Sequence, residues 1–176
     1  MIVFLDFEAS SLGKRSFPIE VGWVMEDGRE ESHLIRPAPG WDDWTEEAER
    51  IHGIPLARLR GEGTPHDVVA HRMVEELSGH ALHASAPSWD GKWLSALLRA
   101  AALPRHALRL RDTEDAQREA ALAILGAGRT AEAEAIIAAV RDETERDGPP
   151  AHRALDDARS ELERWREVRR RAEEMR

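Results

Sequence analysis

The amino-acid sequence predicts an α/β fold in which a mixed sheet of five strands carries helices on both faces. Two observations predict it. The first part of the chain holds three apolar or alternating segments separated by turn residues, which is typical of antiparallel strands. The remainder alternates segments of helical periodicity with short apolar segments that we interpret as further strands. The length of 176 residues fits one domain spanning 1–176.

The first three strands are expected over residues 2–7, 18–25 and 30–36, with a small, polar loop over 9–17. Asp27-Gly28 indicates a hairpin between the second and third strands. A helix with acidic residues in its first turn is expected to start within residues 42–48 and to end near His52-Gly53. Residues 55–63 are expected to form a connection.

The rest of the chain predicts alternating helices and strands. A helix is expected to begin at Thr64-Pro65, with an apolar stripe of Val68, Val69, Met73, Val74 and Leu77. We expect a strand over 80–85, a helix opened by Asp90, a weak strand over 107–110, two helices within 114–146 divided at 126–128, and a rigid break at Gly148-Pro149-Pro150. The last helix is expected over 152–171, with a buried stripe of Leu155, Ala158, Leu162, Trp165, Val168 and Ala172.

The composition excludes several classes of function. The chain has no cysteine, which rules out disulfides, thiolate metal sites and cysteine nucleophiles. No apolar stretch approaches the roughly 20 residues of a membrane span, and the N-terminus lacks the pattern of a signal peptide, so a cytoplasmic protein is expected. The net charge of −9 argues against broad nonspecific binding to nucleic acid.

The most informative stretch is the first expected strand, which runs from apolar residues into Asp6, Phe7 and Glu8. Residues two apart in a strand point to the same face, so Asp6 and Glu8 are expected side by side. Two neighbouring carboxylates near a core are costly unless a cation holds them. This pair therefore predicts a divalent metal site.

Three later residues are candidates to complete that site. Asp90 follows an expected strand at a helix start, the position where α/β folds place their sites. Asp157 lies near the start of the last helix, and His152 lies five residues before it. Such a set suits two Mg²⁺ or Mn²⁺ ions about 4 Å apart that clamp a phosphate, with a histidine as the proton acceptor.

The order Asp-x-Glu, then Asp at a helix start, then His-x4-Asp resembles the DEDDh branch of the 3′-to-5′ exonucleases. This superfamily includes proofreading subunits, ribonuclease T and oligoribonuclease. The resemblance extends to Pro18-Ile19-Glu20-Val21-Gly22 and to Ile51-His52-Gly53-Ile54. It implies a ribonuclease H-like sheet and a hydrolase that releases nucleoside monophosphates from the 3′ ends of single-stranded DNA or RNA.

The resemblance also implies roles for individual residues. Asp6, Glu8 and Asp157 would bind the first metal, Asp6 would bridge to the second, and Asp90 would hold metal-bound waters. His152 would be the general base, and Asp156 would face solvent. The backbone at Ala9 and Ser10 would lie near the terminal 3′-hydroxyl, and Leu12 would pack between the last bases.

The sequence departs from the family at Ser85-Ala86, at Trp89 and at Ser11, which concern substrate positioning and loop geometry. Simpler interpretations remain open for single residues. Asp6 and Glu8 could be a solvated strand end, Asp90 an N-cap, and His152 with Asp157 an ordinary helix start. For Trp41 and Trp44, packing of their loop is favoured over base stacking. For His52 and Arg153, a contact to phosphate and a structural role are both open.

Two other functions remain open. One is a non-catalytic nucleic-acid or protein-binding module, which loss of a metal ligand would favour. The other is a phosphodiesterase for very short oligonucleotides, which would fit the acidic charge. The sequence does not decide between DNA and RNA, and it leaves the oligomeric state open, with a dimer as one option.

Overall fold

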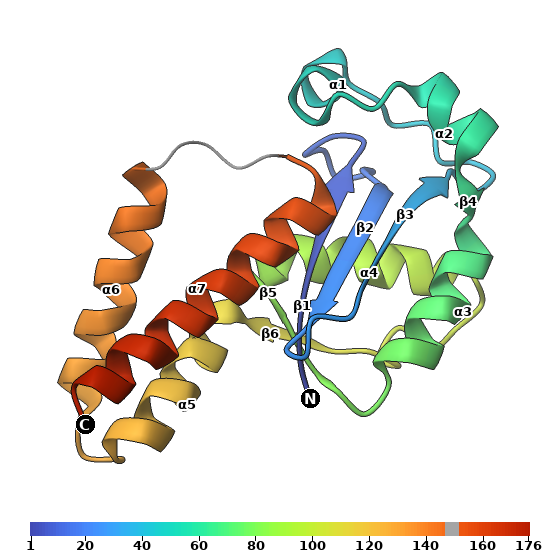
Figure 1. Ribbon diagram of the computed structural model, residues 1–176. Coiled ribbons are helices and arrows are strands. Elements are labelled where there is room, and N and C mark those ends of the chain that lie inside the picture. The colour runs from blue at the N-terminus through green and yellow to red at the C-terminus, as the bar shows by residue number, and fades with distance from the viewer. Residues whose placement is uncertain (147–151) are drawn as a thin grey trace.

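The computed structural model describes residues 1–146 and 152–176, and it contains a mixed six-stranded sheet with helices on both faces (Figure 1). The strands are β1 (Ile2–Ala9), β2 (Pro18–Met25), β3 (Glu30–Arg36), β4 (Thr64–Pro65), β5 (Ala81–Ala84) and β6 (Leu110–Asp112), and their spatial order is β4-β3-β2-β1-β5-β6. β1, β2 and β3 are antiparallel, whereas β5 and β6 continue parallel to β1. The expected α/β fold is confirmed.

Seven helices connect these strands within the described residues. They are α1 (Glu46–His52), α2 (Leu56–Glu62), α3 (His66–Leu77), α4 (Pro87–Ala100), α5 (Thr113–Leu125), α6 (Thr130–Arg146) and α7 (Ala154–Glu174). Thr45 caps α1 by accepting a hydrogen bond from the Ala48 N–H, and Gly53 ends it in the left-handed conformation. Among the described residues, no helix is long and apolar enough to cross a membrane.

Several sequence expectations need correction. Residues 55–63 contain helix α2, and Thr64-Pro65 forms a sixth, two-residue strand beside β3 instead of a helix start. Asp90 does not open its helix, because α4 begins three residues earlier at Pro87. The weak strand lies at Leu110–Asp112 and not at 107–110, and the last helix begins at Ala154 and not at 152. The expected break at 148–150 lies outside the described residues.

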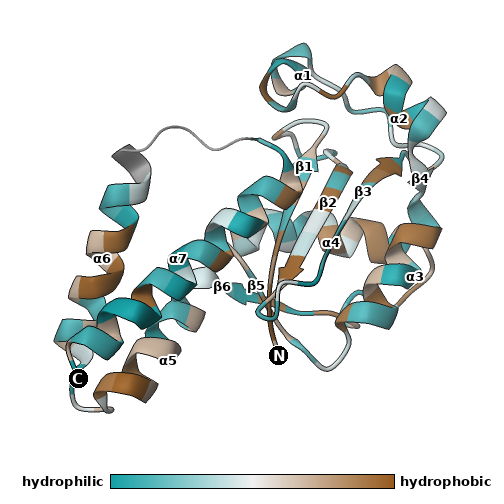
Figure 2. Ribbon diagram, viewed as in Figure 1, coloured by the Kyte–Doolittle hydropathy of each residue, from teal (hydrophilic) through white to brown (hydrophobic). Residues whose placement is uncertain are grey.

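The two apolar stripes are also partly corrected. Val68 is 52% exposed, and Ala70 takes a buried place in the α3 stripe instead. Leu155 is half-buried, while the other expected residues of the α7 stripe are buried. Figure 2 shows that α7 consists mostly of hydrophilic residues, whereas β2 carries hydrophobic segments.

Each face of the sheet packs against its own helices. Alternate residues of β1, including Val3, Leu5 and Phe7, belong to a core with β2, α3 and α4. Phe4 points to the opposite face, where it packs with Val24 and with residues of α5 and α7. Asp6 and Glu8 share the face of Phe4 because side chains alternate along a strand. The first strand thus carries its acids on the side covered by α7.

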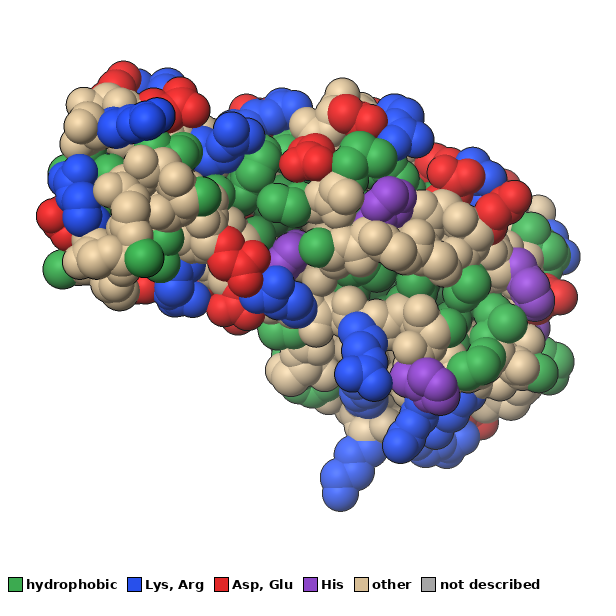
Figure 3. Space-filling view, turned by 90° about the horizontal axis from the view of Figure 1, so that it is seen from below, with side chains coloured by type: hydrophobic (Ala, Val, Ile, Leu, Met, Phe, Trp, Pro, Cys, Tyr) green, Lys and Arg blue, Asp and Glu red, His purple; other side chains and the backbone are tan. Residues whose placement is uncertain are grey.

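Helices α5, α6 and α7 form a lobe beside the sheet (Figure 1), held by a separate apolar core. The carboxyl end of β1 lies near the first turn of α7, at one end of the molecule (Figure 1). Figure 3 views the opposite end, where acidic and basic side chains are interspersed around apolar ones. The chain therefore brings its acidic motifs to one end of the sheet.

Candidate active site

Asp6 and Glu8 lie at the carboxyl end of the central strand β1, directly opposite Gly22 and Glu20 of β2. The pairing of β1 with β2 shifts between Glu8 and Ala9, at the edge of the site. Such irregularities bend a strand and re-aim its side chains, and they are common beside active sites. The expected neighbouring pair of carboxylates is therefore present on one face of the strand.

Asp90 reaches the same strand from the first turn of α4. Its Oδ1 accepts a hydrogen bond from the Phe7 N–H at 3.3 Å, between the two acids of β1. This N–H is open because the pairing of β1 with β5 ends at Phe4 and His83. Asp90 is only 1% exposed, and its Oδ2 is buried without a hydrogen-bond partner in the described part of the chain.

His152 and Asp157 approach from the start of α7. Glu8, His152 and Asp157 each offer one ligand atom, and these three atoms lie within 4.8 Å of one another. His152 precedes the helix, and its φ of 52° is a left-handed conformation that residues other than glycine rarely adopt. Asp156 is exposed and pairs with Arg159, so the expectation that it faces solvent is confirmed.

The clustered acids raise one another's pKa. Burial, followed by the charges of Asp90, Glu8, Asp157 and Glu161, holds the pKa of Asp6 well above its usual range. Burial raises the pKa of Glu8 to about 8, with Asp157 and Glu20 adding to it and Arg153 opposing it. Burial raises the pKa of Asp90 to about 7, although backbone N–H groups favour its charged form.

These properties fit a divalent cation. Buried carboxylates resist ionisation unless a positive partner is present, and the unpaired Oδ2 of Asp90 has no such partner among the described residues. Oxygen ligands with one imidazole suit hard or borderline divalent ions. The residues brought together here therefore form a group able to bind metal ions.

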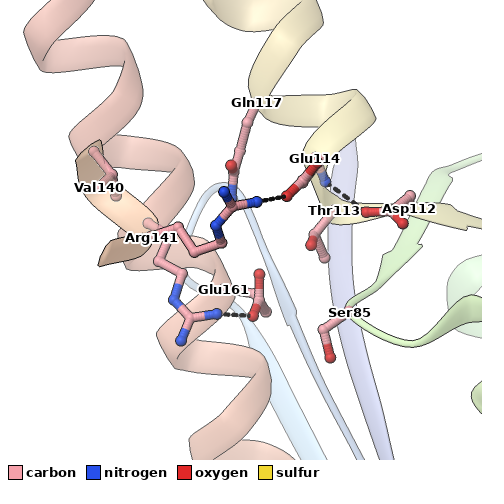
Figure 4. A pocket seen from close by; sticks show the side chains of 9 residues that line it. Ser85, Asp112, Thr113, Glu114, Gln117, Val140, Arg141 and Glu161 are labelled. Atoms are coloured by element: carbon pink, nitrogen blue, oxygen red, sulfur yellow. Dashed lines mark hydrogen bonds and ion pairs between the residues drawn. The ribbon is translucent and has the colours of Figure 1, made fainter. Parts of the chain in front are cut away.

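Glu161 is a further acid at this site that the sequence analysis missed. It lies one turn after Asp157 on the buried side of α7, where it pairs with Arg164 at 2.5 Å. Figure 4 shows it with Ser85, Thr113 and the ion-paired Arg141 and Glu114 around a pocket of about 290 Å³. Burial raises its pKa. A charged residue within an otherwise apolar stripe was the signal that could have revealed it.

The three expected substrate-binding residues differ in exposure. Ala9 and Ser10 are buried, and the Ser10 backbone is engaged, since its N–H donates to Phe17 O and its carbonyl accepts from the Thr45 N–H. Leu12 is 73% exposed in the loop after β1. The Leu12 side chain is thus accessible to a ligand, whereas Ser10 hydrogen-bonds the loop to the residues that precede β2 and α1.

Four residues whose roles the sequence left open make packing, hydrogen-bond or ion-pair contacts. Trp41 stacks on Phe17 with ring centroids 5.2 Å apart, and Trp44 packs on the same ring, which confirms the packing interpretation of that loop. His52 is buried, and its Nδ1 accepts a hydrogen bond from the Ile54 N–H at the end of α1. Arg153 forms an ion pair with the buried Glu20 at 2.6 Å.

No protein-family model matches the sequence, and no curated protein matches it either. Solved structures do match. The structure is similar to an exonuclease I of Methylocaldum szegediense, with a TM-score of 0.70, 19% identity, and coverage of 97% of this chain and 40% of that chain. It is similar to an E. coli exonuclease I–single-stranded DNA complex with bound zinc, with a TM-score of 0.69, 16% identity, and coverage of 97% and 40%.

A third match is E. coli exonuclease I in complex with a dT13 oligonucleotide, with a TM-score of 0.65, 14% identity, and coverage of 92% of this chain and 39% of that chain. The chain thus spans about two fifths of the length of these exonucleases. At this level of identity the likeness concerns the fold. The chain has the α/β fold of these exonuclease I structures, with a candidate metal-binding group of acids and a histidine at the end of its central strand.

Proposed function

We propose that the chain is a metal-dependent 3′-to-5′ exonuclease that acts on single-stranded nucleic acid and releases nucleoside monophosphates. One observation carries the proposal. Asp6 and Glu8 of β1, Asp90 of α4 and Asp157 of α7 interact as a group, and His152 lies against two of them. The fold shared with exonuclease I structures supports the same conclusion.

The carboxylates would hold two Mg²⁺ or Mn²⁺ ions. Asp6, Glu8 and Asp157 would contact the first ion, Asp6 would also contact the second, and Asp90 would act through water. When bound, such ions orient the scissile phosphate and stabilise the charge that develops on its oxygens. The buried carboxyl groups can all be ionised only when this positive charge is present, so metal binding should release protons.

His152 would accept the proton of the attacking water. An imidazole is suited to this role because its unperturbed pKa lies near neutrality. The water oxygen bonds to phosphorus, the bond from phosphorus to the 3′-oxygen of the preceding nucleotide breaks, and that oxygen takes up a proton from solvent. The products are a nucleoside 5′-monophosphate and a strand shortened by one nucleotide with a new 3′-hydroxyl.

The residues after β1 would orient the 3′ end. The backbone of Ala9 would lie near the terminal 3′-hydroxyl, with Ser10 holding the loop in place through its hydrogen bonds to Phe17. The exposed side chain of Leu12 would contact the last bases. A net charge of −9 leaves little long-range attraction for a polyanion, so these local contacts should dominate recognition.

The direct test uses single-stranded DNA and RNA labelled at the 5′ end, incubated with Mg²⁺ or Mn²⁺. We expect a ladder of labelled products that shortens from the 3′ end, together with unlabelled mononucleotides that are detected by chromatography. Asp157→Asn should abolish the ladder, whereas Asp156→Asn, which alters the adjacent exposed acid, should leave it intact. Absence of mononucleotides on every substrate, or equal activity of the two variants, would contradict the proposal.

A further inference from the structure

Strand β2 places two residues beside the acids of β1. Gly22 lies directly opposite Asp6, and Glu20 lies directly opposite Glu8. Cross-strand partners share a face of the sheet, so both residues point towards α7. These two positions belong to the segment Pro18-Ile19-Glu20-Val21-Gly22, whose purpose the proposed chemistry leaves unexplained.

Gly22 lets the first turn of α7 rest on the strand itself. A Cβ atom at this position would lie 2.3 Å from the Leu155 nitrogen and 2.5 Å from the Leu155 Cα. These are backbone atoms of a helix, so they could not move aside as a flexible side chain could. Any side chain at position 22 would therefore push the start of α7 away from Asp6.

Glu20 fixes the same turn in place. Its carboxylate is buried and accepts hydrogen bonds from Arg153 Nη2 at 2.6 Å and Arg153 Nε at 3.0 Å. It also accepts a hydrogen bond from the Ala154 N–H at 3.2 Å. The first N–H groups of a helix lack partners within the helix, and Arg153, the N-cap residue of α7, supplies no side-chain cap. Glu20 thus caps α7 from a neighbouring strand.

The residue next to this anchor is His152. Its left-handed φ of 52° is unfavourable for a side-chain-bearing residue and persists only where the surroundings impose it. On its C-terminal side it is linked by the peptide bond to Arg153, whose side chain donates hydrogen bonds to the Glu20 carboxylate. Asp157 differs, because it lies within the hydrogen-bonded helix and its N–H donates to the Arg153 carbonyl.

We propose that Glu20 is a positioning residue that acts through Arg153 to hold the His152 imidazole against Glu8 and Asp157; this inference rests on the proposed function. Gly22 makes the arrangement possible by admitting the helix. The ion pair also solves an electrostatic problem, since two glutamates directly opposite each other repel and Arg153 offsets one of them. The metal ligands depend less on the anchor than His152 does, because β1 and α4 hold three of them and the backbone hydrogen bonds of α7 hold Asp157.

The test compares Glu20→Gln with Glu30→Gln. Glu30 offers a matched control, because it also accepts hydrogen bonds from an arginine of α7, Arg159, but lies away from the acids. Glu20→Gln should lower kcat by about 10- to 100-fold, the usual effect of losing a residue that orients a catalytic group. KM, and the Mn²⁺ dissociation constant measured by calorimetry without substrate, should change by less than about threefold. Glu30→Gln should leave all three unchanged.

A double-mutant cycle tests whether Glu20 acts through His152. In a His152→Ala background, Glu20→Gln should cause no further loss of kcat, because the group it positions is gone. An equal loss in both backgrounds, or a wild-type kcat in Glu20→Gln, would overturn the inference. If Glu20→Gln does not fold, Arg153→Lys replaces it. This variant keeps the charge but not the two-pronged contact, and it should give a smaller loss with the same dependence on His152.

A spectroscopic measurement separates this inference from the proposed function. The ring resonances of His152 in the metal-free protein should shift in Glu20→Gln and stay unchanged in Glu30→Gln. If the wild-type protein hydrolyses no nucleic acid but this pattern appears, the proposed function fails and the positioning of His152 stands. If Glu20→Gln leaves the His152 resonances unchanged, the positioning claim itself is wrong.

Discussion

Strand β1 presents two faces of opposite character within the same eight residues. Val3, Leu5 and Phe7 are buried in an apolar core with α3 and α4. Asp6 and Glu8 point to the other side, where α7 brings further acids and a histidine. One face is stabilised by burial, whereas the other holds like charges that oppose folding. The apolar face thus supports the fold, whereas the acidic face holds charges that burial alone does not favour.

The largest expected effect falls on the acidic face. Asp6→Asn removes the carboxylate that would contact both ions, so activity should fall by about a thousandfold or more, which corresponds to several kcal/mol of lost transition-state stabilisation. Because the variant also removes a buried charge, the metal-free protein should be at least as stable as the wild type. Rates on a labelled strand and urea unfolding check the two parts. If Asp6→Asn loses activity only because it unfolds, the acidic face of β1 does not have a role separate from the fold.

His152→Gln should have the next largest effect. Losing a general base typically costs about 10²- to 10⁴-fold in rate. Affinity for Mn²⁺ should drop far less than in Asp6→Asn. A wild-type rate on a labelled strand in His152→Gln would remove His152 from the role of base.

The opposite outcome is expected on the apolar face. Leu5→Ala removes a buried side chain next to Asp6 in β1 and should cost about 2–5 kcal/mol of unfolding free energy. At temperatures where the variant is folded, kcat should stay near the wild-type value. Urea unfolding monitored by tryptophan fluorescence measures the loss, and a large drop in kcat for the folded variant would show that the faces are not independent.

The last effect concerns pH. The pKa of Glu8 rises from 4.5 to about 8 on folding, and that of Asp90 rises from 3.8 to about 7. The folded state therefore retains protons that the unfolded chain loses, so the stability of the metal-free protein should fall as pH rises from about 4 to 8. Divalent ions should restore stability most at the upper end of this range, where they bind deprotonated ligands.

Urea unfolding in the presence of a chelator, at pH 5 and pH 8, measures this dependence. Glu8→Gln should weaken it, because one of the groups with a raised pKa no longer titrates. A difference in stability between wild type and Glu8→Gln that is the same at both pH values would mean that the Glu8 carboxyl titrates as it does in the unfolded chain.

Local patterns were sufficient to predict much of the fold. β2 and β3 match their expected bounds because alternation and the Asp27-Gly28 turn are short-range signals. Helix α2 was missed, since it is short, contains Gly61 and has no side-chain cap. The two-residue strand β4 was missed because its pairing with β3 is a tertiary contact that no local pattern encodes.

The candidate site divides in the same way. Asp6, Glu8, Asp90, His152 and Asp157 stood out by residue type and spacing, and the fold brings these acids and the histidine together. Glu20 and Gly22 were noted only as a strand motif. Their contacts with α7 join residues more than 130 positions apart, so only the folded chain reveals them. Glu161 differs, because a charged residue among the apolar residues of the α7 stripe is a local signal that was visible in the sequence.

The most direct test of the central claim is the anomalous scattering of crystals soaked in Mn²⁺. We expect two peaks on the acidic face of β1, one in contact with Asp6, Glu8 and Asp157 and both within reach of Asp6. Asp6→Asn crystals should lose at least one of them. No peak at these carboxylates, or peaks only elsewhere on the surface, would contradict the assignment of this face of β1 as a metal centre.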